Sequence, residues 1–201
     1  MIKLVPEWAY HYEAFWNSIR NRNLWLIHMR YGAVFMLASL FLASNLFDIV
    51  FSQRQIIALI SITGIILIYN FVLHRLRGHL TCTPGKFNPL HFSLLQIILD
   101  LIMLMLLVYH TFTILYTLFI LFIYHMLIGS LILPGFVILV IAFAVTFTFT
   151  SIVGLEYYDI IVHHHIYGLH TVELKDNFNF IISSIGIFNF TMFTALSLIH
   201  I

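Results

Sequence analysis

The residues with the clearest chemical potential lie in two apolar stretches near the centre of the chain. Gln96 and Asp100 occur in HFSLLQIILDLIMLMLLVYH, and Tyr124 and His125 interrupt LYTLFILFIYHMLIGSLIL. A spacing of four places Gln96 and Asp100 on one face of a helix. A carboxylate beside an imidazole can exchange a proton near neutral pH or bind a ligand. The simpler alternative is a buried polar contact between helices, worth about 1 kcal/mol or less.

The composition identifies the solvent in which these groups must work. The 201 residues are 62% hydrophobic and 8% charged, and the mean hydropathy is +1.02. Soluble domains carry about a quarter charged residues, so we expect the lipid bilayer to surround most of this chain. The formal net charge of +1 offers no basic field for nucleic acid. The single cysteine, Cys82, excludes a disulfide framework within the chain.

The hydropathy pattern predicts an all-α integral membrane protein with a six-helix transmembrane bundle. A spanning helix needs about 20 mainly apolar residues, and six stretches qualify, near 31–51, 56–73, 91–109, 111–133, 136–155 and 178–200. We therefore expect residues 30–201 to form the membrane domain.

Residues 1–29 have a different character and are expected to form a cytoplasmic, amphipathic helix in the membrane interface. Its aromatic face should lie among the headgroups. The residues that define this face recur at spacings of three and four: Trp8, Tyr12, Phe15, Trp16 and Ile19.

The distribution of basic residues predicts the orientation. One side of the six-span arrangement carries Lys3, Arg20, Arg22, Arg30, Arg75, Arg77 and Lys86, whereas the opposite side carries only Arg54 and Lys175. Cytoplasmic segments are enriched in Lys and Arg. Both termini are therefore expected in the cytoplasm, with the acidic, histidine-bearing segment 156–177 on the outer side.

The same topology predicts that Asp100 and His125 meet. The third span enters from the cytoplasm and the fourth returns after a tight turn, so a rise of about 1.5 Å per residue brings both residues to similar depth. We expect a contact between them, made directly or through Gln96 or Tyr124.

The outer segment supplies a second group of candidates, either metal ligands or pH-sensing residues. They are Glu156, Asp159, His163, His164, His165 and His170. Zn²⁺ or Cu²⁺ could bind two or three of them, and a hydrated loop with no special role is the alternative. No cofactor is predicted, although haem, a quinone or a divalent metal stay open as alternatives because the chain has twelve histidines.

Four stretches carry a resemblance to a known family: FWNSIRNRNLWLIHMRYGAV, PGKFNPLHFSLLQIILDLIMLMLLVY, LFIYHMLIGSLILPG and LEYYDIIVHHHI. They resemble the membrane-embedded N-terminal input region of two-component sensor histidine kinases common in Bacteroidetes- and Chlorobi-like bacteria. The resemblance covers about Phe15 to His165. It implies a sensor of the bacterial inner membrane that signals as a homodimer and passes a conformational change through its sixth span. The family's Thr-Gly-Gly-like turn between the third and fourth spans is replaced by His110-Thr111-Phe112-Thr113.

The chain has no phosphoacceptor segment and no ATP-binding motif before Ile201, so it is expected not to be an enzyme itself. A P-loop, a dinucleotide fingerprint and a nucleophile elbow are also missing. Two further functions stay open: an accessory or structural subunit of a larger membrane complex, and a redox protein that binds haem or a quinone.

Overall fold

The computed structural model describes residues 12–44, 51–80, 87–111, 116–162 and 178–197, and its elements are helical throughout these ranges. In chain order the elements are α1 (Glu13–Ser44), α2 (Gln53–Leu76), the short 3-10 helix η2 (Arg77–His79), α3 (Pro89–Thr111), α4 (Tyr116–Ser130), α5 (Gly135–Tyr157) and α6 (Phe178–Ser197).

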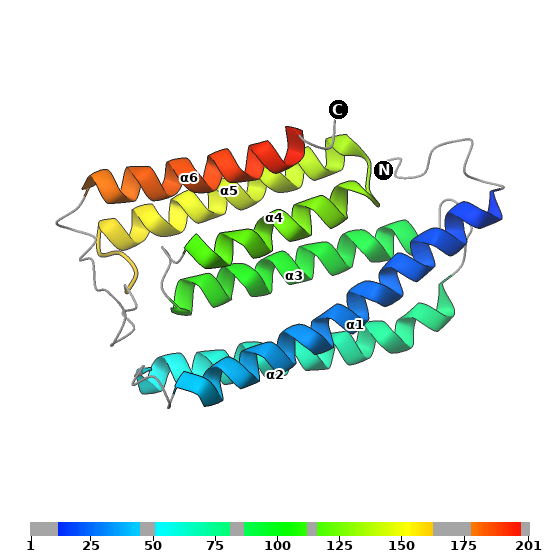
Figure 1. The fold of residues 1–201 in the computed structure, drawn as a ribbon, viewed down its shortest axis with the longest axis horizontal. Coiled ribbons are helices and arrows are strands. Elements are labelled where there is room, and N and C mark those ends of the chain that lie inside the picture. The colour runs from blue at the N-terminus through cyan, green and yellow to red at the C-terminus, as the bar shows by residue number, and fades with distance from the viewer. Residues whose placement is uncertain (1–11, 45–50, 81–86, 112–115, 163–177, 198–201) are drawn as a thin grey trace.

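The helices lie side by side along the long axis, and each runs antiparallel to the one before it (Figure 1). Two long-range hydrogen bonds connect the helix ends. Arg20 of α1 donates to the Leu80 carbonyl after η2, and Gln55 of α2 donates to the His110 carbonyl of α3. The start of α1, the end of α2 and the start of α3 therefore share one end of the bundle.

The central helix of the bundle is α3, which packs against α1, α2, α4 and α5. In its most apolar stretch 56% of the residues are buried, compared with 18% in α1 and 17% in α2. The exposed residues of α1 and α2 include large apolar side chains such as Phe35 and Ile68. Such surfaces suit lipid better than water.

Within the described residues, four helical stretches are long and apolar enough to cross a membrane, namely Glu13–Ala43, Gln53–His79, Pro89–Thr111 and Gly135–Tyr157. The remaining two contain shorter apolar stretches, Phe119–Ser130 in α4 and Ile181–Thr194 in α6. The architecture therefore agrees with a helical membrane bundle. The number of spans, six, stays a prediction.

An aromatic cluster joins α4, α5 and α6. Phe188 of α6 stacks on Phe149 of α5 with 4.1 Å between ring centroids, and it meets Phe119 and Phe122 of α4 edge-on at 4.9 and 5.3 Å. All four rings are buried. Edge-to-face contacts such as the two made by Phe188 with α4 are favourable for aromatic pairs.

A second close approach occurs at Gly129 of α4. A Cβ atom there would lie 2.6 Å from Cδ1 of Ile138 on α5 and 3.5 Å from Cδ1 of Ile97 on α3. The absence of a side chain at Gly129 therefore allows three helices to pack together, as small residues commonly do between membrane helices.

The first helix differs from the expectation in two respects. It continues without a break through residues 29 and 30, where a separate interfacial helix was expected to end. Trp16 and Ile19, expected to face the headgroups, are each 3% exposed and belong to the hydrophobic core. Their stripe continues through Asn23, Leu26 and Arg30, all buried, because residues three and four apart share one helix face.

Candidate functional site

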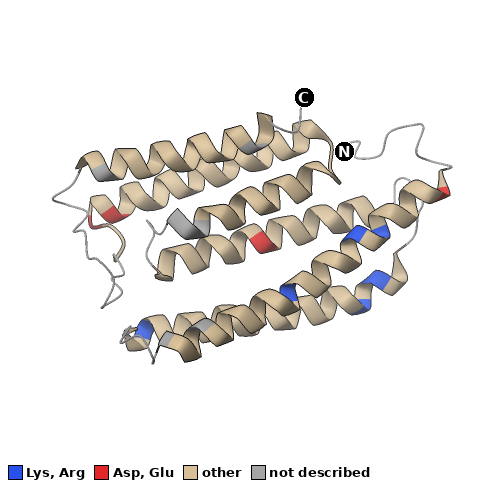
Figure 2. Ribbon diagram, viewed as in Figure 1, with Lys and Arg blue, Asp and Glu red and all other residues tan. Residues whose placement is uncertain are grey.

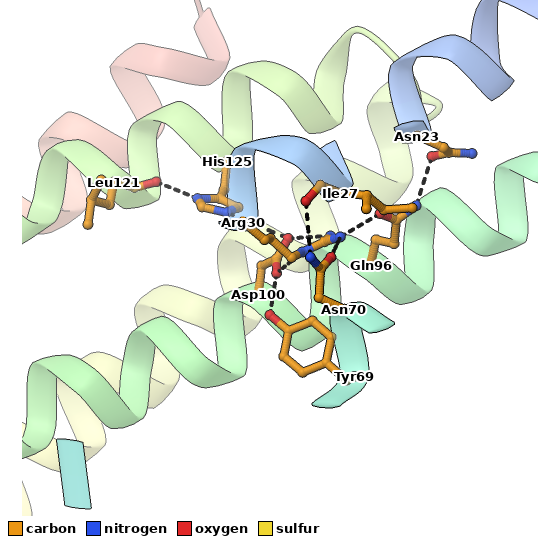
Figure 3. Close-up of polar contacts among 9 residues, drawn as sticks. All are labelled: Asn23, Ile27, Arg30, Tyr69, Asn70, Gln96, Asp100, Leu121 and His125. Carbon is orange, nitrogen blue, oxygen red and sulfur yellow. Dashed lines mark hydrogen bonds and ion pairs between the residues drawn. The ribbon is translucent and has the colours of Figure 1, made fainter. Parts of the chain in front are cut away.

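The most prominent polar feature inside the bundle is an ion pair between Arg30 of α1 and Asp100 of α3 (Figure 3). Asp100 lies at the midpoint of α3. Arg30 donates from Nε to Oδ1 at 2.6 Å and from Nη2 to Oδ2 at 2.7 Å, and both side chains are 6% exposed. Two parallel, charge-assisted hydrogen bonds of this kind fix the orientation of both groups.

Two residues of α2 and one more of α3 complete the surroundings of this pair. The Tyr69 hydroxyl donates to Oδ1 of Asp100 at 2.7 Å. Nη1 of Arg30 donates to Oε1 of Gln96 at 2.7 Å and to Oδ1 of Asn70 at 3.4 Å. The pair therefore connects three helices, α1, α2 and α3.

The hydrogen bonds continue from Gln96 toward the end of the bundle where α1 begins. Oδ1 of Asn23 accepts from Nε2 of Gln96 at 3.1 Å and from the Ser93 hydroxyl at 2.6 Å, and its Nδ2 donates to the Pro89 carbonyl at 3.0 Å. We call the whole set the buried polar network, comprising Asn23, Arg30, Tyr69, Asn70, Ser93, Gln96 and Asp100. Polar groups inside a membrane protein must form hydrogen bonds to one another, because lipid tails offer no hydrogen-bond partners.

His125 of α4 lies at the edge of the network. Its Nε2 is 3.7 Å from Oδ2 of Asp100, and its Nδ1 is 2.7 Å from the Leu121 carbonyl oxygen. A carbonyl can only accept, so Nδ1 carries the proton of this hydrogen bond. In the neutral ring Nε2 is then an acceptor, and it faces a carboxylate oxygen that is also an acceptor. This explains why their separation exceeds hydrogen-bonding distance.

The carboxylate of Asp100 has room for one more donor. Its two oxygens offer about four acceptor positions, of which Arg30 and Tyr69 occupy three. The geometry places Nε2 of His125 next to Oδ2, which has one donor. A proton on Nε2 would therefore convert this contact into a charge-assisted hydrogen bond.

Tyr124 lies beside His125, with 5.8 Å between the ring centroids, and it also approaches Trp25 of α1 at 6.2 Å. Its hydroxyl is buried and has no hydrogen-bond partner in the part of the chain that the structure describes. Neither Tyr124 nor Gln96 bridges Asp100 and His125. Gln96 instead bonds to Arg30 and Asn23.

The predicted meeting of Asp100 and His125 is thus confirmed as a contact, but the main partner of Asp100 is a different residue. Arg30 was expected on the cytoplasmic side among the basic residues that set the orientation. It is buried against the midpoint of α3 instead. A sequence signal for it exists in hindsight, because Asn23 and Arg30 are seven residues apart and therefore lie on one face of a helix, two turns from each other.

Two of the outer candidates lie within the described residues, and the structure buries one and exposes the other. Glu156, expected in a loop, lies in the last turns of α5 and is 2% exposed, so Asp100 is not the only buried carboxylate. Asp159 is exposed and has a φ of 56°. The Ile160 amide donates back to the Leu155 carbonyl and the Asp159 amide to the Glu156 carbonyl, as in a Schellman motif that ends a helix. His163, His164, His165 and His170 lie outside the described residues.

Charged side chains are sparse along the helices, and most basic ones lie on α1, α2 and η2 near the end of the bundle where α1 begins (Figure 2). These are Arg20, Arg22, Arg75 and Arg77. Within the described ranges, no group of three His, Cys, Asp or Glu side chains is arranged to hold a metal ion.

Comparisons of the chain with protein-family models, with curated proteins and with solved structures found no match.

Proposed function

We propose that this chain is a membrane-embedded signal-input module in which the buried polar network senses a proton and α6 transmits the response. The observation that carries the proposal is the arrangement around Asp100. Its bidentate ion pair with Arg30 connects three helices, and Nε2 of His125, on a fourth helix, lies 3.7 Å from Oδ2 of Asp100. The module relays a change of conformation and catalyses no reaction of its own.

A role in signalling accounts for the ion pair better than a role in stability does. Burying two charges costs desolvation energy that their attraction barely offsets, and apolar replacements of similar volume are often as stable. Ionisable residues inside membrane proteins are rare and usually functional. The pair also holds α1, α2 and α3 in one arrangement, so a change in its partners alters the arrangement of all three helices.

Protonation of His125 is the proposed cue. Histidine is the side chain that ordinarily changes charge between about pH 5 and 8. With a proton on Nε2, His125 would donate to Oδ2 of Asp100, and the present 3.7 Å would shorten to about 2.8 Å. The ionisable groups that face His125 are Asp100 and Arg30 across the helix interface and Tyr124 beside it. Closing this gap by a little under 1 Å is the proposed movement at the contact between α4 and α3.

The aromatic cluster provides the path from α4 to α6. Phe122 precedes His125 by three residues, so both lie on one side of α4. Its ring meets Phe188 of α6 at 5.3 Å, and Phe188 is fully buried. Closely packed cores shift between discrete arrangements rather than deform smoothly. A displacement of α4 is therefore passed to α6, the last described helix.

The topology follows from the positive-inside bias. The end of the bundle with Arg20, Arg22, Arg75 and Arg77 faces the cytoplasm, and all six helices cross the bacterial inner membrane. The end of α6 then also lies on the cytoplasmic side, where a histidine kinase core or an equivalent partner would receive the signal, as the resemblance implies. The module works as a homodimer or within a larger membrane complex.

A chimeric kinase tests this proposal. Residue 201 is joined in frame to the phosphotransfer and ATP-binding core of a histidine kinase, and autophosphorylation in lipid nanodiscs is measured from about pH 5 to 8. We expect a pH-dependent rate in the original sequence and a flat profile in His125→Gln. His28→Gln, which changes an exposed histidine on α1, is the matched control and should keep the pH response.

Two results would overturn the proposal. One is an unchanged pH response in His125→Gln, which would place the sensor elsewhere. The other is a pH-independent rate in the original chimera while spin labels on α4 and α6 report a pH-dependent distance between these helices. That combination would show that the helices respond to pH without changing the activity of the kinase core, and it would refute the signalling role.

A further inference from the structure

The outward face of α1 carries an open groove at the basic end of the bundle. The groove has a volume of about 650 Å³ and is lined by Ala14, Asn17, Ser18, Asn21, Arg22 and Trp25. These residues recur at spacings of three and four, so they form one continuous face of the helix. All of them are exposed.

The groove is rich in unused hydrogen-bond donors. In the described part of the chain, Asn17, Ser18 and Asn21 make no side-chain hydrogen bond. Arg22 donates from Nη1 to the Leu131 carbonyl at the end of α4, which leaves most of its five N–H donors available. Amide, hydroxyl and guanidinium donors on one face suit the oxygens of a phosphate group.

Helix lengths place this groove at the level of lipid headgroups. The part of α1 from Trp25 to Ser44 is about 29 Å long, close to the hydrocarbon thickness of about 30 Å. On α2 the stretch between the charged residues Arg54 and Arg75 is about 31 Å long by the same rise per residue, so it also matches the hydrocarbon thickness. Trp25, which is 46% exposed, therefore marks the boundary where tryptophan is enriched.

The same helix face continues below the groove as an apolar track. Met29 and Met36 are 42% and 54% exposed, and between them Gly32 has no atom within 4 Å of a Cβ position. The face thus has polar donors at headgroup level and an open, apolar path at the level of acyl chains. A phospholipid has a matching polar headgroup and apolar acyl chains, whereas a free phosphate ion would occupy only the polar groove.

We propose that this face of α1 binds an anionic phospholipid, with the phosphate in the groove and one acyl chain along Met29, Gly32 and Met36. The negative charge is favoured by Arg22 and by Arg20, Arg75 and Arg77 at the same end of the bundle, because basic residues at a membrane surface attract anionic lipids. This site is independent of the proposed proton sensing.

Lipid retention and thermal unfolding of the full chain test the proposal. The protein in detergent is given phosphatidylglycerol, phosphatidylcholine or inorganic phosphate, its Tm is measured, and bound lipids are counted by native mass spectrometry. We expect phosphatidylglycerol alone to raise the Tm and to stay bound. The Asn17→Ala/Asn21→Ala variant should bind it about tenfold more weakly, because two hydrogen bonds are lost.

The controls separate a site from a general charge effect. Asn17→Ala/Asn21→Ala removes no side-chain hydrogen bond within the described residues, so its fold and its Tm without lipid should be unchanged. Arg54→Gln removes an exposed charge at the opposite end and should bind phosphatidylglycerol as the original chain does. Equal losses in both variants, equal effects of the two lipids, or a matching Tm increase with inorganic phosphate would each refute the site.

Discussion

In an Arg30→Met variant, the carboxylate of Asp100 would lose two of its three hydrogen bonds and its only full opposite charge in the described chain. The Tyr69 hydroxyl would be the remaining donor. Removing one partner of a buried pair leaves an uncompensated charge and costs about 3–5 kcal/mol. Gln96 would also lose its bond from Nη1 of Arg30. We therefore expect the free energy of unfolding to fall by about 3–5 kcal/mol.

The matched variant is Arg30→Met/Asp100→Leu, which removes both charges and keeps apolar volume at both positions. Because no unpaired charge is left, this double variant should recover most of the lost stability, by the same reasoning that makes apolar replacements of buried pairs nearly neutral. It should nevertheless abolish the pH response of the chimeric kinase, since His125 would have no carboxylate to contact.

Steric trapping or detergent-induced unfolding in bicelles measures these free energies. Ordinary interhelical hydrogen bonds in membrane proteins are worth about 0.6 kcal/mol on average. A loss near that value in Arg30→Met would show that Asp100 is not desolvated and would refute the predicted cost of an unpaired buried charge. A double variant as unstable as the sum of the two single variants would refute it equally, because the pair would then have no coupling.

Two further variants, one in the buried polar network and one at a helix packing contact, should have smaller effects. Tyr69→Phe removes one donor to Oδ1 of Asp100 while Arg30 stays in place, so stability measured in the same assay should fall by about 1 kcal/mol or less; a loss as large as that of Arg30→Met would contradict the assignment of Arg30 as the main partner. Gly129→Ala would place a Cβ atom 2.6 Å from Cδ1 of Ile138 and should cost about 1 kcal/mol by overpacking, because Cδ1 is the far end of a side chain that can turn aside. Adding Ile138→Val removes that methyl group and should restore stability, and no improvement in the double variant would refute the predicted clash.

The local sequence pattern was sufficient to predict that the side chains of Gln96 and Asp100 are buried inside the bundle. Two polar residues four apart in an apolar helix must share a face, and that face must turn away from lipid. The structure buries both of them. The approach of His125 could also be predicted, because a tight turn between two helices sets which helices are neighbours and which residues share a depth.

Arg30 could not be assigned in this way. It is 70 residues from Asp100 in sequence, and an arginine at the start of an apolar stretch usually lies at the membrane surface. The position of Arg30 depends on how far α1 is shifted along its axis relative to α3, and on which face of α1 points toward α3. Those quantities come from the packing of Trp16, Ile19 and Leu26 into the core.

The burial of Glu156 was another feature that the sequence did not predict. Its place after a long apolar stretch indicated an exposed loop, but α5 continues to Tyr157 and the αL conformation of Asp159 ends it. Aspartate reaches that conformation more easily than most residues. A shift of the helix end by two residues moved Glu156 from the expected loop into the buried part of the helix.

The sequence alone determined the class of protein and the residues that must be satisfied inside it. So few charges among so many apolar residues require lipid as the solvent, and helix periodicity turns Gln96 and Asp100 inward. Only the tertiary structure decided which group satisfies Asp100, since pairing across helices depends on their rotation and axial offset. These follow from the packing of side chains far apart in the chain, and they placed a guanidinium against the carboxylate for which an imidazole was the expected partner.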